Sequence, residues 1–148
     1  MDFKNINFKK IFEIVKIPIT ILIALTCVGI LINFINNFLI LSLWWGGVLF
    51  LCAVCSGWVG FKAAKNNLST IESGISGVIT WLVPGAVGLT IGGLTSFLNA
   101  LLWGAVEGYE AIAFVGGAIV ILILLTVGAI ISFIIGIVGG YLGKNKNS

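Results

Sequence analysis

The stretch GWVGFKAAKNN, residues 57–67, ends an apolar segment with glycine and tryptophan and then changes abruptly to lysine and asparagine. The chain closes on a similar stretch, GYLGKNKNS, residues 140–148. Tryptophan and tyrosine favour the interface between membrane and water, and lysine is typical of the cytoplasmic side of a span. Both stretches therefore indicate the ends of membrane-spanning helices that leave the bilayer on the same side.

The composition places the whole chain in the membrane class. It has 148 residues, of which 59% are hydrophobic and 9% charged, and its mean hydropathy is +1.21. Soluble domains carry about 25% charged residues. The apolar segments are long enough to cross a bilayer and leave no room for a separate soluble domain. We therefore expect one integral membrane domain over residues 1–148.

The apolar segments predict an all-α, polytopic membrane protein. Four transmembrane helices are expected at about residues 17–34, 38–61, 83–103 and 120–143. A very short turn around Asn36 and Asn37 joins the first two, so they are expected to form an antiparallel hairpin.

The N-terminal segment, residues 1–16, has an amphipathic pattern. Phe8, Ile11 and Phe12 fall on one helical face, with lysines largely opposite. This pattern is typical of a helix that lies in the plane of the membrane interface. Pro18 is expected to bend the chain between this interfacial helix and the first span.

Residues 69–72, Ser-Thr-Ile-Glu, form a capping box, so a helix is expected to begin there. A helix from this point to Trp103 would be about 52 Å long, whereas the hydrocarbon core is only about 30 Å thick. Pro84 is the natural break. We therefore place the third span at residues 83–103 and a juxtamembrane helix at residues 70–82.

The two halves of the chain share a pattern that predicts a tandem repeat. Gly-aromatic-aliphatic-Gly occurs at residues 57–60 and 140–143, and each of the two prolines stands near the start of an odd-numbered span. The predicted units are two helical hairpins, residues 17–67 and 68–148, which would be parallel repeats. Chance similarity among apolar helices is the alternative.

All the lysines lie on one side of the predicted spans. They are Lys4, Lys9, Lys10, Lys16, Lys62, Lys65, Lys144 and Lys146. The chain has no arginine, and the opposite side carries Glu107 and Glu110. The positive-inside rule then predicts a multi-pass protein of the cell membrane with both termini in the cytoplasm. A solvated loop explains the two glutamates more simply than a binding site does.

Small residues recur at helical spacing in the later spans. The candidate helix-packing positions are Gly88, Gly92, Gly128, Ser132, Gly136 and Gly140. Small residues let helices approach closely in lipid, where burial of apolar surface provides no driving force. This glycine-zipper spacing predicts contacts between spans of one chain, or between copies in a homo-oligomer.

No set of residues in the sequence suggests catalysis, a cofactor or a metal site, and nothing indicates a nucleic-acid partner. The chain has no histidine, and no Asp, Glu, Lys or Arg lies within the predicted spans. This pattern argues against proton-coupled transport. Cys52-x-x-Cys55 resembles a redox pair, but only Cys27 remains as a further thiol, and an apolar setting does not activate a thiol. Packing roles are the simpler interpretation.

Two asparagines stand out among the polar residues of the predicted spans. Asn33 and Asn99 each follow a proline by 15 residues. Asparagine in a span can cap a helix end, form a hydrogen bond across helices or line a polar path, and the first two roles are commoner. Asn33 and Asn99 are the candidates for lining a path if one exists.

Three stretches resemble a group of small archaeal four-span membrane proteins that share a domain of unknown function. The stretches are SGWVGFKAAKNN (56–67), ESGISGVI (72–79) and GIVGGYLGK (136–144). The likeness covers about residues 45–143 and implies no activity.

The sequence therefore predicts a non-catalytic integral membrane protein, either a scaffold or a subunit of a membrane assembly. Its expected partners are the lipid bilayer and either a second copy or another membrane protein. The alternative is a small channel or facilitator for a neutral or cationic solute. A polar path would favour this alternative, whereas a lipid-exposed stripe of glycine and serine would favour the scaffold.

Overall fold

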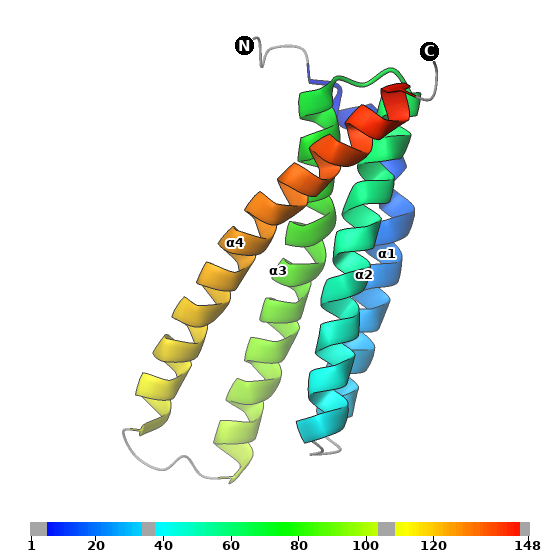
Figure 1. The fold of residues 1–148 in the computed structure, drawn as a ribbon. Helices are drawn as coiled ribbons and strands as arrows, with labels where there is room; N and C mark the ends of the chain where they lie inside the picture. The colour runs from blue at the N-terminus through cyan, green and yellow to red at the C-terminus, as the bar shows by residue number, and fades with distance from the viewer. Residues whose placement is uncertain (1–5, 34–37, 104–108, 146–148) are drawn as a thin grey trace.

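The computed structural model of the chain is a bundle of long helices (Figure 1). It describes residues 6–33, 38–103 and 109–145, and their side chains except at residues 33, 38–42, 45, 92–103, 109–118, 120 and 121. The helices are α1 (Phe8–Asn33), α2 (Phe38–Lys65), α3 (Thr70–Trp103) and α4 (Tyr109–Asn145).

Each helix contains a described segment that is long and apolar enough to cross a membrane. These segments are Phe8–Ile32, Gly46–Lys65, Thr70–Ile91 and Leu122–Asn145. The predicted all-α fold with four candidate spans is therefore confirmed. The grouping of the helices into tandem repeats stays a prediction.

The predicted breaks at the prolines are absent. Pro18 lies inside α1 and Pro84 lies inside α3, and both helices continue through them. Both prolines are buried against the bundle. In a packed membrane bundle, neighbouring helices and Ser or Thr side chains compensate for the backbone hydrogen bond that a proline removes. Residues 70–82 are therefore the first turns of α3, not a separate juxtamembrane helix.

The N-terminal segment likewise continues directly into the first span. Ile11 and Val15 are fully buried and Ile14 is 5% exposed, whereas Phe8 and Phe12 face outward. The buried face continues down the helix to Leu22, so one apolar stripe runs through the whole of α1. This continuity explains why residues 8–16 pack on the bundle, where a separate interfacial helix was expected.

The central pair of helices is α2 and α3. α1 packs on both of them, and α4 also packs on both, but α1 does not contact α4 within the described residues. Figure 1 shows that α4 lies close to α2 near the two termini and diverges from it toward the opposite end of the bundle.

The connection between α2 and α3 is built from local hydrogen bonds. Asn67 adopts a left-handed backbone conformation (φ 60°). Its N–H donates to Ala64 O at 3.0 Å, and Leu68 N–H donates to Ala63 O at 3.1 Å. This is the Schellman pattern that ends a helix. The capping box at residues 69–72 then begins α3.

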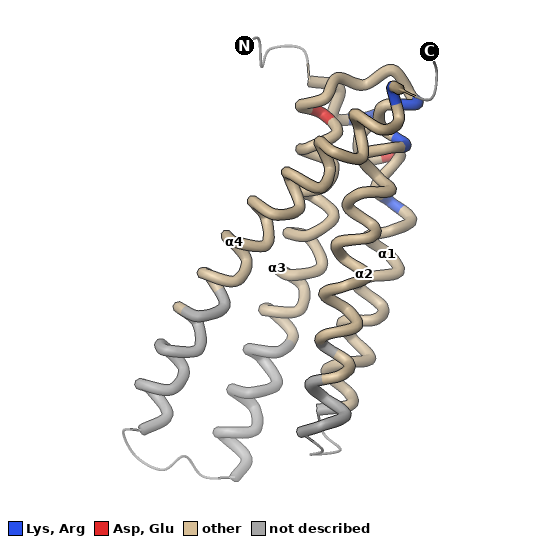
Figure 2. The backbone as a smooth tube through the Cα atoms, in the orientation of Figure 1, with Lys and Arg blue, Asp and Glu red and all other residues tan. Residues whose placement is uncertain are grey.

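The predicted one-sided placement of lysine is confirmed for the lysines that the structure describes. These are Lys9, Lys10, Lys16, Lys62, Lys65 and Lys144, and they lie toward the end of the bundle that carries both termini (Figure 2). Lys4 and Lys146 are outside the described residues. The side of the membrane that this end faces stays a prediction.

In α2, α3 and α4 the bundle buries small hydroxylated side chains, and on α4 it exposes large aliphatic ones. The fully or almost fully buried hydroxylated residues are Ser56, Ser73, Ser76, Thr80 and Ser132. On α4, by contrast, Leu122, Ile130 and Ile134 are all more than half exposed. An aliphatic outer surface is suited to contact with lipid chains. The backbone groups beneath it are hydrogen-bonded within their own helices and therefore need no water.

Candidate functional site

Glycine and serine line the place where α2, α3 and α4 meet near the termini. We call this region the small-residue core, and it consists of Ser56, Gly60, Ser73, Gly74, Gly77, Ser132, Gly136, Gly139 and Gly140. Side chains this small allow helix backbones to approach one another directly.

The geometry of the small-residue core requires glycine. A Cβ atom added at Gly136 would lie 2.6 Å from the carbonyl oxygen of Ser73 and 3.2 Å from the Cα of Gly74. One added at Gly60 would lie 2.8 Å from the Cα of Gly136. Because these neighbours are backbone atoms, they cannot rotate away. The three helices therefore touch through their main chains.

The predicted packing stripe of α4 faces the chain's own helices. Gly128 lies against the ring of Trp81, and Gly140 lies against the side chain of Ser73. Ser132 is 2% exposed. The stripe is thus occupied within one chain, which leaves it unavailable for contact with a second copy in this arrangement.

The remaining predicted site residues lie on other contacts or outside the description. Gly88 of α3 faces α1, where an added Cβ atom would lie 2.9 Å from Thr26 Cγ2. The surroundings of Gly92 and the side chains of Asn33 and Asn99 lie outside the described part of the structure.

The hydroxyl groups in and beside the small-residue core donate to carbonyl groups of their own helices, and that of Ser56 also lies 3.4 Å from Gly77 O on α3. Ser56 Oγ donates to Cys52 O at 2.8 Å, and Ser76 Oγ donates to Ser73 O at 2.7 Å. Thr80 Oγ1 donates to Ser76 O at 2.8 Å. A hydroxyl bonded in this way needs no water inside a membrane. The small-residue core therefore contains polar residues, but backbone atoms fill the space between its helices.

Two tryptophan indole groups form hydrogen bonds between helices, and the sequence did not predict either bond. Trp44 Nε1 donates to Leu25 O on α1 at 3.3 Å. Trp81 Nε1 donates to Leu125 O on α4 at 3.2 Å. For Trp44 the available signal was its position inside the predicted span 38–61, whereas Trp81 lies in the predicted juxtamembrane segment 70–82 and gave no such signal. The acceptors could not be foreseen, because they lie 19 and 44 residues away.

The three cysteines are free thiols. Cys52 is 5% exposed and packs with Leu22 and Val48. Cys27 and Cys55 are partly buried. For Cys52 this arrangement is the packing role that the sequence suggested.

At the lysine-bearing end, the predicted capping box is present in full. Ser69 N–H donates to Glu72 Oε2 at 2.6 Å, and Glu72 N–H donates to Ser69 Oγ at 3.2 Å. The other carboxylate oxygen of Glu72 accepts from Asn7 N–H at 2.8 Å. Glu72 therefore ties the start of the chain to the start of α3.

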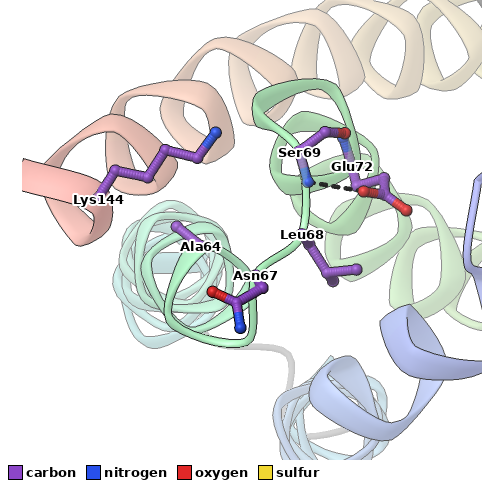
Figure 3. Close-up of a pocket in the computed structure, with 6 residues that line it drawn as sticks. All are labelled: Ala64, Asn67, Leu68, Ser69, Glu72 and Lys144. Carbon is purple, nitrogen blue, oxygen red and sulfur yellow. Dashed lines mark hydrogen bonds between the residues drawn. The ribbon is translucent and has the colours of Figure 1, made fainter. Parts of the chain in front are cut away.

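A depression of about 440 Å³ lies beside the capping box. Its lining residues are Ala64, Asn67, Leu68, Ser69, Glu72 and Lys144 (Figure 3). Figure 3 shows the Glu72 carboxylate pointing away from Lys144, which approaches from α4. Lys144 Nζ instead donates to Thr70 Oγ1 at 3.3 Å. The ammonium group of Lys144 therefore lies at the rim of the depression and forms no ion pair with Glu72.

No family model matches this chain, and searches of curated proteins and of solved structures find no match. The resemblance to small archaeal membrane proteins therefore stays a prediction.

Proposed function

We propose that this chain is a non-catalytic integral membrane protein that acts as a scaffold or as a subunit of a larger assembly in the cell membrane. Both termini would lie in the cytoplasm, because the described lysines gather at their end of the bundle. The observation that carries the proposal is a pair of glycines on the outside of α2.

Gly46 and Gly47 are exposed, and a Cβ atom added to either would meet nothing within 4 Å. The other glycines of α2, Gly57 and Gly60, contact α4. Glycine costs a helix about 1 kcal/mol relative to alanine. In membrane helices, small residues are enriched where another helix approaches. The exposed pair therefore fits a helix from a second polypeptide.

The surroundings of the glycine pair suit such a contact. Leu43 and Phe50 are each 69% exposed on the same part of α2. Large apolar side chains beside a small-residue notch are able to pack around a partner helix.

The closed small-residue core supports a scaffold more than a pore within one chain. Conduction requires polar groups that replace the hydration of the solute along a path. Here the hydroxyls of Ser56, Ser76 and Thr80 donate to carbonyl groups of this chain's own helices, and glycine backbones fill the space between them.

A photo-crosslinking amino acid placed at Gly47 tests this proposal in native membranes. We expect a discrete adduct with a second copy or with another membrane protein. The matched control is Leu49, which is 52% exposed on the opposite side of the same helix and should give no discrete adduct. Equal labelling at both positions would remove the case for a partner at the glycine pair.

Flux measurements separate the scaffold from the channel alternative. Liposomes that carry the purified chain should pass water, small neutral solutes and monovalent cations no faster than empty liposomes. Robust flux that falls when Asn33 and Asn99 are both changed to Leu would overturn the scaffold proposal in favour of the channel.

A further inference from the structure

The ends of α2 and α4 nearest the termini carry cations and aromatic rings side by side. We call this surface the lysine–aromatic rim, and it consists of Trp58, Phe61, Lys62, Lys65, Tyr141 and Lys144. It lies at the lysine-bearing end of the bundle that Figure 2 shows.

Two lysines of the rim fold back onto rings of their own helix. Lys62 Nζ lies 4.8 Å from the centre of the Trp58 ring. Lys65 Nζ lies 4.9 Å from the centre of the Phe61 ring. Each ring belongs to the preceding turn, so both side chains run toward the bilayer rather than outward into water. The ammonium groups therefore lie at the level of the aromatic belt, where lipid headgroups are found.

Other lysines at this end also contact neutral groups. Lys10 Nζ donates to the backbone carbonyl of Asn66 at 2.6 Å. Lys144 Nζ donates to the hydroxyl of Thr70 at 3.3 Å. The carboxylate of Glu72 is 8% exposed and accepts two backbone N–H groups. Glu72 attracts Lys10, but within the described residues no carboxylate forms an ion pair with Lys62, Lys65 or Lys144.

Backbone contact brings the lysines of the two helices together. A Cβ atom added at Gly143 would lie 2.7 Å from the carbonyl oxygen of Phe61 and 3.0 Å from the Cβ of Ala64. The next residue of α4 is Lys144, so its charge lies beside the end of α2. Like charges on touching helix ends repel, and an anion placed among them lowers that repulsion.

We infer that the lysine–aromatic rim binds the headgroups of anionic phospholipids in preference to zwitterionic ones. The lysines supply charge and hydrogen-bond donors for the phosphate group, while Trp58 and Tyr141, 46% and 67% exposed, supply amphipathic rings at headgroup depth. A zwitterionic headgroup adds an ammonium group of its own, which the uncompensated lysines repel. The selectivity therefore follows from the net charge of the headgroup.

The test uses the full chain in non-ionic detergent, titrated with phosphatidylglycerol or with phosphatidylcholine of the same acyl chains. Native mass spectrometry reports how many lipid molecules stay bound. We expect tighter binding of phosphatidylglycerol, with each surface lysine contributing about a fivefold change in affinity. Lys62→Gln together with Lys65→Gln should abolish most of this preference, and the Arg double variant should keep it.

The matched control is Lys9→Gln together with Lys16→Gln, which removes the same charge from exposed positions of α1. It should bind phosphatidylglycerol almost as the unchanged chain does. Equal losses in both Gln double variants would show attraction to overall charge only and would overturn the proposal. Equal retention of the two lipids would overturn it as well. Displacement of the lipid by inorganic phosphate would identify a site for free anions instead.

Circular dichroism and gel filtration check that each variant is folded. If the Gln double variant at Lys62 and Lys65 unfolds, the Arg double variant still tests the proposal, because it keeps the charge of the rim. Loss of the preference for phosphatidylglycerol in the folded Arg double variant, but not in the control on α1, would overturn the proposal.

Discussion

Replacing Gly136 by alanine is the sharpest test of the small-residue core. The new Cβ atom would lie 2.6 Å from the carbonyl oxygen of Ser73, whereas ordinary van der Waals contact begins at 3.4 Å. α3 and α4 would therefore have to separate by about 0.8 Å at this level. Overpacking of this kind costs about 1–3 kcal/mol, and the better helix propensity of alanine offsets about 1 kcal/mol of that. We expect a net loss of up to about 2 kcal/mol in unfolding free energy.

The matched control is Gly46→Ala, where the added methyl group meets nothing within 4 Å. It should leave the isolated chain unchanged or stabilise it by up to about 1 kcal/mol. The assay is reversible unfolding of the purified chain in mixed micelles, followed by circular dichroism. Equal stability of the two variants would refute the claim that α3 and α4 touch through their backbones. Leu at Gly136 should disrupt the bundle, whereas Leu at the exposed Ile134 should be mild.

Three further outcomes are expected. Trp81→Phe should cost at least about 0.5–1.5 kcal/mol of unfolding free energy, because it removes a hydrogen bond to α4 and also the part of the indole that packs beside Gly128; an unchanged stability would contradict both contacts. Glu72→Ala should cost about 1–3 kcal/mol and speed hydrogen exchange at the Asn7 amide, whereas unchanged exchange would contradict the tie between α3 and the N-terminus. In a Cys-free background, single cysteines at Gly108 and Asn147 should label from opposite sides of the membrane, and labelling of both from outside would contradict an even number of spans.

The number of candidate spans could be predicted because local features of the sequence determine them. Long apolar segments require helices in a membrane, where each backbone group must find its partner within its own segment. The lysines mark one end of the bundle, and the capping box at Ser69 and Glu72 depends on residues three apart. Each of these signals is complete within a short stretch of chain.

The tertiary structure decided whether the prolines interrupt the helices. Pro18 and Pro84 are helix breakers by local criteria. Both are instead buried inside continuous helices whose packed faces, apolar in α1 and rich in small residues in α3, continue past the proline. That stabilisation comes from other helices, so no window of sequence contains it.

The tertiary structure also decided which partner each small-residue stripe meets. The spacing of Gly128, Ser132, Gly136 and Gly140 fits contact with another copy as well as contact within the chain. In lipid, hydrophobicity does not distinguish the inside of a bundle from its outside, so an apolar helix carries little periodic signal for its buried face. Shape complementarity decides instead, as where the ring of Trp81 fills the space beside Gly128. Such a fit depends on two residues distant in sequence, and only the folded chain brings them together.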